Sequence, residues 1–173
     1  MFENLDTPAL ILDADKLDAN CRRMRIKMEG HRVALRPHMK TAKNVDVARI
    51  ALAAPIGPIT VSTLREAEYF FDHGFRDILY AVGVVPNKVP RIAALNNRGA
   101  KITVIVDSVE GAKALVDASA SSNVRLPAMV EIDSDGHRAG VPPGHHSLLE
   151  IAEVLGDGLR GVMTHAGDSY NSD

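Results

Sequence analysis

The alternation of short apolar runs with longer stretches of helical period constrains this sequence more than any other feature. Most of the runs are continuously apolar, as in parallel strands that are covered on both faces. Such repetition indicates a series of βα units and places the chain in the α/β class. The predicted barrel strands are Val33–Leu35, Ile59–Val61, Asp77–Ala81, Lys101–Val106, Ala128–Ile132 and Gly161–Thr164.

Helices are predicted between these strands and before the first of them. Over Asp15–Met28, apolar residues recur at i, i+4, i+7 and i+11, which forms one stripe of a helix. Thr63 and Glu66 form a capping box at the start of another helix. The remaining predicted helices are Val45–Ala54, Leu64–His73, Asn87–Asn97, Val109–Ala120 and Ser147–Leu155, and Gly74 and Gly99 stand where helices should stop.

Six βα units fit either an open doubly wound sheet or a closed (β/α)₈ barrel. No glycine-rich nucleotide-binding fingerprint follows the first strand, which weakens the open sheet. A complete barrel needs eight strands and typically about 250 residues, whereas this chain has 173. We therefore predict an incomplete (β/α)₈ TIM-type barrel with about six of its strands present.

Composition narrows the class of protein. The formal net charge of −2 gives no broad basic field for nucleic acid. No apolar run approaches the roughly 18 residues of a membrane span, and the first residues lack the pattern of a secretory signal. The single cysteine, Cys21, excludes an internal disulfide and is predicted to be a buried thiol. We expect a cytoplasmic protein.

Cationic and imidazole side chains follow the strand predicted at Val33–Leu35. If the extended backbone persists, Arg36, His38 and Lys40 lie two apart and project from one face. Cations that converge on one spot favour a bound anionic group, and a lysine among them is a candidate nucleophile. A solvated basic loop explains the same residues, and spacing alone favours it.

Two further strands turn polar where they end. Glu131 and Asp133 share a face at the end of one strand, and Arg138 follows after a turn. This group could orient a cofactor or clamp a carboxylate, although an ordinary loop ion pair explains it equally well. Near the last strand, His165 and Tyr170 could face a ligand that Gly167 lets the backbone approach.

No metal ligands are assigned, because His145 and His146 lie at no convincing spacing from others. If the barrel closes, the polar ends of the three strands point into one volume, since barrel enzymes keep their sites at the carboxyl ends of the strands.

At these residues the sequence resembles the alanine racemase N-terminal-domain superfamily of fold-type III pyridoxal phosphate (PLP) enzymes, and within it the D-threonine aldolase and D-serine dehydratase branch. The most specific matching segment is Arg36-Pro-His-Met-Lys-Thr-Ala-Lys43, in which Ala42 replaces a histidine that is common in the family. The supporting segments are Asp6-Thr-Pro-Ala9, Ser62-Thr-Leu-Arg-Glu-Ala-Glu68, Asp77-Ile-Leu79, Glu131-Ile-Asp133, Arg138-Ala-Gly-Val141 and Thr164-His-Ala-Gly167.

The resemblance implies that Lys40 is catalytic and holds PLP covalently. The sequence pattern predicts an opening strand at Ala9–Leu12, and the resemblance implies that residues 1–14 would pair with a C-terminal β domain missing from this chain. Residues 15–173 would then form a partial PLP-binding barrel. In the family, Arg138 and His165 would line the cofactor, with Glu131 and Asp133 supporting them. The full predicted cofactor-binding set is Lys40, His38, Arg138, His165, Arg36, Glu131, Asp133, Gly167 and Tyr170.

The activity that the resemblance implies is that of a lyase acting on small D-amino acids. We predict a D-threonine aldolase-like enzyme that cleaves β-hydroxy-D-amino acids to glycine and an aldehyde. D-serine dehydratase and amino-acid racemase chemistry share Lys40 and stay open, as does a PLP-binding homeostasis protein without turnover. A divalent metal (Mn, Mg or Zn) is expected only through the missing domain, and a homodimer is expected for the full-length protein.

Overall fold

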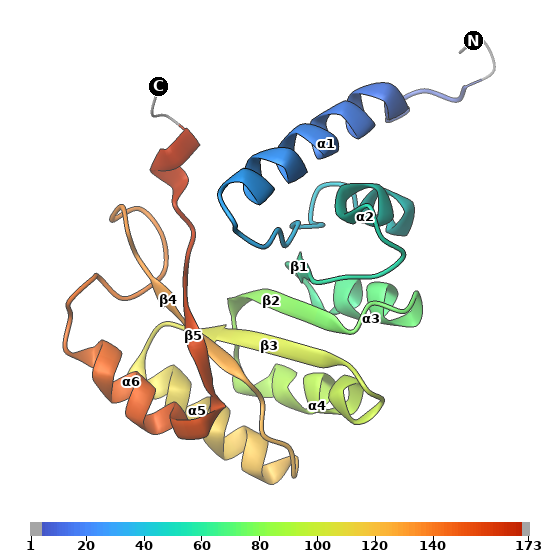
Figure 1. The fold of residues 1–173 in the computed structure, drawn as a ribbon. Helices are drawn as coiled ribbons and strands as arrows, with labels where there is room; N and C mark the ends of the chain where they lie inside the picture. Colours follow the sequence, from blue (N-terminus) through green and yellow to red (C-terminus); the bar gives the residue numbers. More distant parts are fainter. Residues whose placement is uncertain (1–4, 171–173) are drawn as a thin grey trace.

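Five parallel strands form one continuous sheet in the computed structural model, which describes residues 5–170. Their order in the sheet follows their order in the sequence, and each pairs in parallel with the next (Figure 1). The strands are β1 (Ile59–Val61), β2 (Asp77–Gly83), β3 (Lys101–Val106), β4 (Ala128–Ile132) and β5 (Leu159–Thr164).

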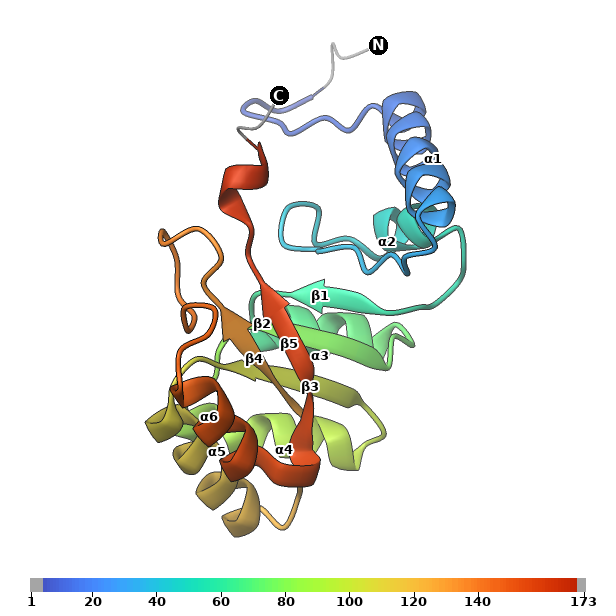
Figure 2. The same ribbon diagram turned by 60° about the vertical axis from the view of Figure 1, so that its left-hand side comes forward.

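Helices connect successive strands and lie together on one side of the sheet (Figures 1 and 2). An unbroken strand order with helices on a single side is the arrangement of a (β/α) barrel, whereas a doubly wound sheet reverses its order and carries helices on both faces. The predicted incomplete barrel is therefore confirmed. The α-helices are α1 (Ala14–Gly30), α2 (Val45–Leu52), α3 (Leu64–Asp72), α4 (Val89–Asn97), α5 (Val109–Ser121) and α6 (Ser147–Leu155), and the short 3₁₀ turns are η1 (Pro86–Lys88), η2 (Gly156–Gly158) and η3 (Gly167–Tyr170).

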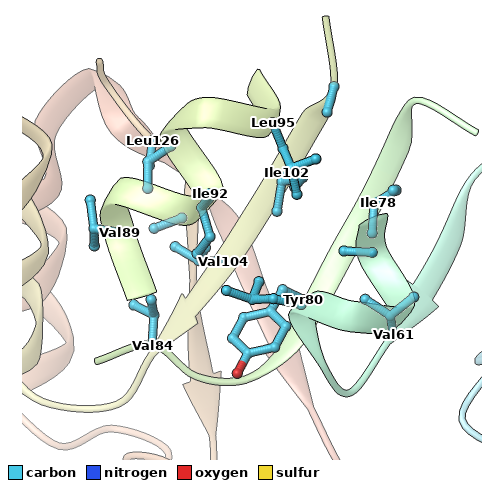
Figure 3. Packing of buried hydrophobic residues seen from close by; sticks show 14 of the residues in the cluster. Val61, Ile78, Tyr80, Val84, Val89, Ile92, Leu95, Ile102, Val104 and Leu126 are labelled. Atoms are coloured by element: carbon cyan, nitrogen blue, oxygen red, sulfur yellow. The ribbon is translucent and has the colours of Figure 1, made fainter. Parts of the chain in front are cut away.

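The core lies between the strands and the helices that cover them. Val89 and Ile92 of α4 belong to one buried cluster with Tyr80 of β2 and with Ile102 and Val104 of β3, and Figure 3 shows Ile92 beside Val104. None of these five side chains is more than 1% exposed. Their burial removes a large apolar area from water and fixes each strand against its own helix.

The strand predicted at Val33–Leu35 is not formed. Pairing with β1 is reduced to one isolated parallel bridge between His38 and Thr60. Pro37 lies in the paired stretch and has no N–H group, so a regular ladder cannot be extended through it. The described sheet therefore has five strands rather than about six.

The segment at Ala9–Leu12 also forms no strand within the part of the chain that the structure describes. Its pairing with a further β domain stays a prediction. The helix predicted over Asp15–Met28 is present as α1, but it has no buried residue and packs chiefly on α2 rather than on the sheet. Cys21 is consequently only half-buried, and the prediction of a buried thiol is wrong.

The predicted helix boundaries agree with the structure at several ends. The Thr63 hydroxyl accepts the Glu66 N–H at 3.1 Å, as a capping box requires, but the Glu66 carboxylate accepts the N–H of Ser62 instead of that of Thr63. Gly74 and Gly99 adopt φ of +96° and +101° just beyond α3 and α4, which glycine does without strain. Among residues 5–170, no helix combines the length and apolar character needed to cross a bilayer.

Candidate active site at the carboxyl edge of the sheet

The carboxyl ends of the strands form one edge of the sheet, called the carboxyl edge below. Lys40 lies at this edge, in a turn that follows the bridge to β1. The Met39 N–H donates to the Thr60 carbonyl at 2.8 Å, and the Thr60 N–H donates to the Pro37 carbonyl at 2.9 Å. The N–H of Lys43 then closes the turn onto the Met39 carbonyl at 2.8 Å. The exposed Lys40 is therefore carried on a short loop that is bonded to the sheet.

His38 is half-buried beside Lys40. Its Nδ1 lies 3.3 Å from the Lys40 backbone N–H, and its Nε2 lies 3.4 Å from the Ser62 hydroxyl. Burial lowers the pKa of His38 below its ordinary value, and the Lys40 charge lowers it further; Glu66 opposes this shift, while His165 adds to it. Lys40, in the same turn, and His165, just after β5, therefore both lower the pKa of the His38 imidazole.

Arg36 does not join these residues. Its guanidinium makes two hydrogen bonds to the Asp77 carboxylate, at 2.9 and 3.0 Å, and a third to the Ile59 carbonyl at 3.2 Å. Asp77 is the first residue of β2, so this bidentate pair lies at the amino end of the sheet. The expectation that Arg36 projects toward Lys40 is wrong, and its role in cofactor binding stays a prediction.

Glu131 and His165 form a tight pair across neighbouring strands. The Nδ1 of His165, just after β5, lies 2.5 Å from a carboxylate oxygen of Glu131 on β4. The Glu131 carboxylate is 5% exposed and the imidazole 21% exposed. Because a carboxylate oxygen accepts, this hydrogen bond is made by the proton on Nδ1, and Nε2 is the ring nitrogen left for another partner. The pair fixes both the tautomer and the direction of the ring.

The loop that carries Arg138 is bound back onto the end of β4. Val141 donates to the Glu131 carbonyl at 2.9 Å and accepts from the Asp133 N–H at 3.0 Å. Gly140 makes this approach possible, because a Cβ at this position would lie 2.5 Å from the Asp133 nitrogen, and its φ is +128°. The Asp133 carboxylate accepts the Gly136 N–H at 2.9 Å, so it shapes the loop.

A cavity of about 470 Å³ opens between the ends of β2, β4 and β5. Glu131, Arg138 and His165 line it together, as the convergence of strand ends predicts. Arg138 has no ion-pair or hydrogen-bond partner among residues 5–170, so its guanidinium is available to an anionic group. Lys40 is not part of the lining; its neighbour His38 is connected to this group only through the effect of His165 on the His38 pKa. The remaining lining residues are Ala81, Val82, Gly83, His137 and Ala139.

The last predicted site residues lie in η3. Gly167 starts this turn, and its N–H donates to the His165 carbonyl at 2.9 Å. The side chain of Tyr170 lies outside the described part of the structure. Asp135 was missed by the sequence reasoning, although its carboxylate accepts the Asp168 N–H at 3.0 Å and so ties the Arg138 loop to η3. That hydrogen bond is the main reason why the pKa of Asp135 is lowered.

Ser62, Glu66 and His137 were also missed as site residues. The capping signal at Thr63 could have directed attention to Ser62 and Glu66, whereas His137 had no signal beyond its place in the loop. Within residues 5–170, no three histidine, cysteine, aspartate or glutamate side chains cluster as metal ligands. A metal held by a further domain stays a prediction.

These features define the chain as part of a (β/α) barrel with a polar cavity at its carboxyl edge. A family model described as the alanine racemase N-terminal domain matches residues 12–173. The chain therefore belongs to the alanine racemase N-terminal domain family, and the resemblance found in the sequence is confirmed.

Several named enzymes align with almost the whole length of this chain. The D-threo-3-hydroxyaspartate dehydratase of Delftia sp. (strain HT23) is 46% identical over 98% of this chain, and its structure superposes with a TM-score of 0.90. The 3-hydroxy-D-aspartate aldolase of Paracoccus denitrificans (strain Pd 1222) is 32% identical over 98% of the chain and 45% of its own length. The D-threonine aldolase of Filomicrobium marinum has a TM-score of 0.80 at 31% identity, over 91% of this chain and 43% of its own. The chain spans 46% of the length of the Delftia relative.

The Gly140→Ala substitution tests the loop that presents Arg138. We expect it to lower the free energy of unfolding by about 2–3 kcal/mol, because the new Cβ meets backbone atoms in a φ region that other residues avoid. Gly136→Ala is the control, since Gly136 has a φ of +73° but no atom within 4 Å of an added Cβ. It should cost about 1 kcal/mol. Urea unfolding measures both, and equal losses would contradict the close-approach argument.

The proximity of Lys40 to His38 has a titration signature. Because the Lys40 charge opposes protonation of the imidazole, Lys40→Gln should raise the pKa of His38 toward its ordinary value of 6.5. Burial remains in this variant, so the rise should be partial. Histidine chemical shifts followed by NMR against pH measure it. Lys101→Gln, at the amino end of β3, should leave the His38 titration unchanged, and an unmoved curve in Lys40→Gln would place the two groups apart.

Proposed function

We propose that the protein containing this chain is a PLP-dependent lyase that acts on β-hydroxy-D-amino acids. The observation that carries the proposal is the grouping of Lys40, His38, the Glu131–His165 pair and Arg138 at one edge of the sheet. A cofactor with an aldehyde and an anionic group needs an amine without a salt-bridge partner and a free cation. Lys40 and Arg138 supply these among the described residues.

Each residue has a role that follows from its contacts. Lys40 binds the cofactor aldehyde through its amine, and Arg138 binds an anionic oxygen of the cofactor or of the substrate. His165, oriented by Glu131, presents Nε2 to the cavity, where it stabilises the cofactor ring or accepts a proton. When bound, PLP withdraws electrons from the bonds at the substrate Cα, which is chemistry that the protein side chains cannot supply.

His38 serves Lys40 directly. Since its pKa is lowered, it is neutral around pH 7 and adds no positive charge beside the amine. Its Nε2 lies 3.4 Å from the Ser62 hydroxyl, a contact that would keep the ring in place beside the Lys40 amine when PLP is held there. His38 is therefore proposed to position Lys40 and to relay a proton near it.

Among the possible substrates, a β-hydroxy-D-amino acid with a second carboxylate has the most support. The 46% identity to the Delftia dehydratase extends over 98% of the chain. Its named substrate is anionic at two positions, and His137 and Arg138 both line the cavity. The aldolase activity predicted from the sequence is the second candidate, and the likeness to the Paracoccus and Filomicrobium aldolases supports it.

The products of one substrate separate these reactions. Dehydration of D-threo-3-hydroxyaspartate gives oxaloacetate and ammonia, whereas cleavage of its Cα–Cβ bond gives glycine and glyoxylate. We expect oxaloacetate as the main product when the complete protein is incubated with PLP and this substrate. D-threonine and D-serine serve as comparison substrates, and D-alanine reports racemisation. Binding of PLP with no turnover of any of these substrates would favour the PLP-binding homeostasis protein.

The expected homodimer is a separate proposal, which gel filtration of the complete protein tests.

The covalent role of Lys40 has its own test. With PLP bound, borohydride reduction should fix the cofactor to the Lys40 peptide, and Lys40→Ala should abolish that adduct, because the amine that attacks the aldehyde is gone. Peptide mass mapping measures the label, and Lys101→Ala should retain it. An undiminished adduct in Lys40→Ala would overturn the assignment.

A further inference from the structure

A buried carboxylate outside the cavity joins the Lys40 turn to the rest of the fold. Glu66 lies in the first turn of α3, and its side chain is only 8% exposed. A carboxylate at this depth is costly unless hydrogen bonds and a cation compensate it. Its partners therefore indicate what it does.

Each oxygen of the Glu66 carboxylate has a different partner. Oε2 accepts the N–H of Ser62 at 2.9 Å, just beyond β1. Oε1 lies 3.6 Å from the Nζ of Lys43. Ser62 also contacts His38 through its hydroxyl, so Glu66 is connected to the Lys40 turn from two sides.

Helix capping explains only part of this arrangement. The Thr63 hydroxyl already accepts the Glu66 N–H at the start of α3, and the bond from Ser62 satisfies one further backbone donor. The ion pair with Lys43 adds nothing to the cap. It acts instead on the turn, whose last residue is Lys43 in the left-handed region with φ of +47°.

The turn therefore presents two amines three residues apart, in different states. Lys43 is held on a buried carboxylate, and an aldehyde must break that ion pair before it reaches the nitrogen. Lys40 has no carboxylate within ion-pair distance among residues 5–170. Both side chains are solvent-accessible, so exposure alone does not choose between them.

We infer that Glu66 is a positioning residue that selects Lys40 as the cofactor-holding amine. It does so by holding the competing amine of Lys43 in an ion pair. This inference rests on the proposed function, because it concerns which lysine receives the aldehyde. Glu66 touches neither the cavity nor the reacting atoms, and it acts through Lys43 and Ser62.

The test uses Glu66→Gln in the complete protein. Glutamine keeps an oxygen for the Ser62 N–H but loses the charge that holds Lys43. Each protein is incubated with PLP and reduced with borohydride, and mass mapping gives the ratio of adduct on Lys43 to adduct on Lys40. We expect the wild-type adduct almost wholly on Lys40 and a ratio roughly fivefold higher in Glu66→Gln, the scale of a partly exposed ion pair.

Glu68→Gln is the matched control. Glu68 lies on the same helix and its carboxylate also pairs with a cation, Arg91, but that pair has no link to the Lys40 turn. Glu68→Gln should therefore keep the wild-type ratio. A merely structural Glu66 would lower the thermal midpoint and the total adduct while leaving all of the label on Lys40, and that result overturns the inference.

Other outcomes are equally decisive. A wild-type adduct already divided between the two lysines overturns the selection by Glu66 but leaves the proposed function intact. No wild-type adduct on either lysine overturns the proposed function, and the inference with it.

A measurement on the unaltered protein covers the case in which Glu66→Gln does not fold. Reductive methylation with formaldehyde and cyanoborohydride should modify Lys43 roughly fivefold more slowly than Lys101, an exposed lysine without an ion pair in the described structure. Equal methylation rates at Lys43 and Lys101 would mean that Glu66 does not hold the Lys43 amine, and they would overturn the inference.

Discussion

The unbroken parallel order of the five strands is the constraint on which the site depends. Because every strand runs the same way and every return passes through a helix on the same side, all carboxyl ends meet at one edge. Residues as distant in sequence as Gly83, Glu131 and His165 thereby line one cavity. The apolar contacts between α4 and the strands hold this geometry, so the polar edge is built on a rigid support.

Much of this arrangement could be predicted from the sequence, because continuous apolar runs mark buried parallel strands. β1, β3 and β4 occupy the predicted ranges to the residue, and the other two differ only in length. The handedness of βα connections then leaves few ways to arrange them. The convergence of Glu131, Arg138 and His165 could be predicted from the rule that the carboxyl ends of parallel strands lie at one edge of the sheet.

The failures share a physical cause, which is that a local pattern does not reveal a distant partner. Arg36 was expected beside Lys40 from its spacing, but its guanidinium binds Asp77, 41 residues further along. The strand at Val33–Leu35 reads as apolar, yet Pro37 interrupts the ladder that would have continued it. The apolar stripe over Asp15–Met28 correctly predicted the helix α1, but this helix packs chiefly on α2 and stays largely exposed.

The distribution of charge around the carboxyl edge leaves two cationic residues of the described structure without a carboxylate partner. Lys43 at this edge is already matched by Glu66, and the His165 imidazole is held by Glu131. Lys40 and Arg138 have no such partner within residues 5–170. A protein surface can neutralise a cation with a carboxylate at little cost. Leaving an amine and a guanidinium unmatched beside rigid, paired neighbours therefore suits a ligand that brings an aldehyde and negative charge of its own.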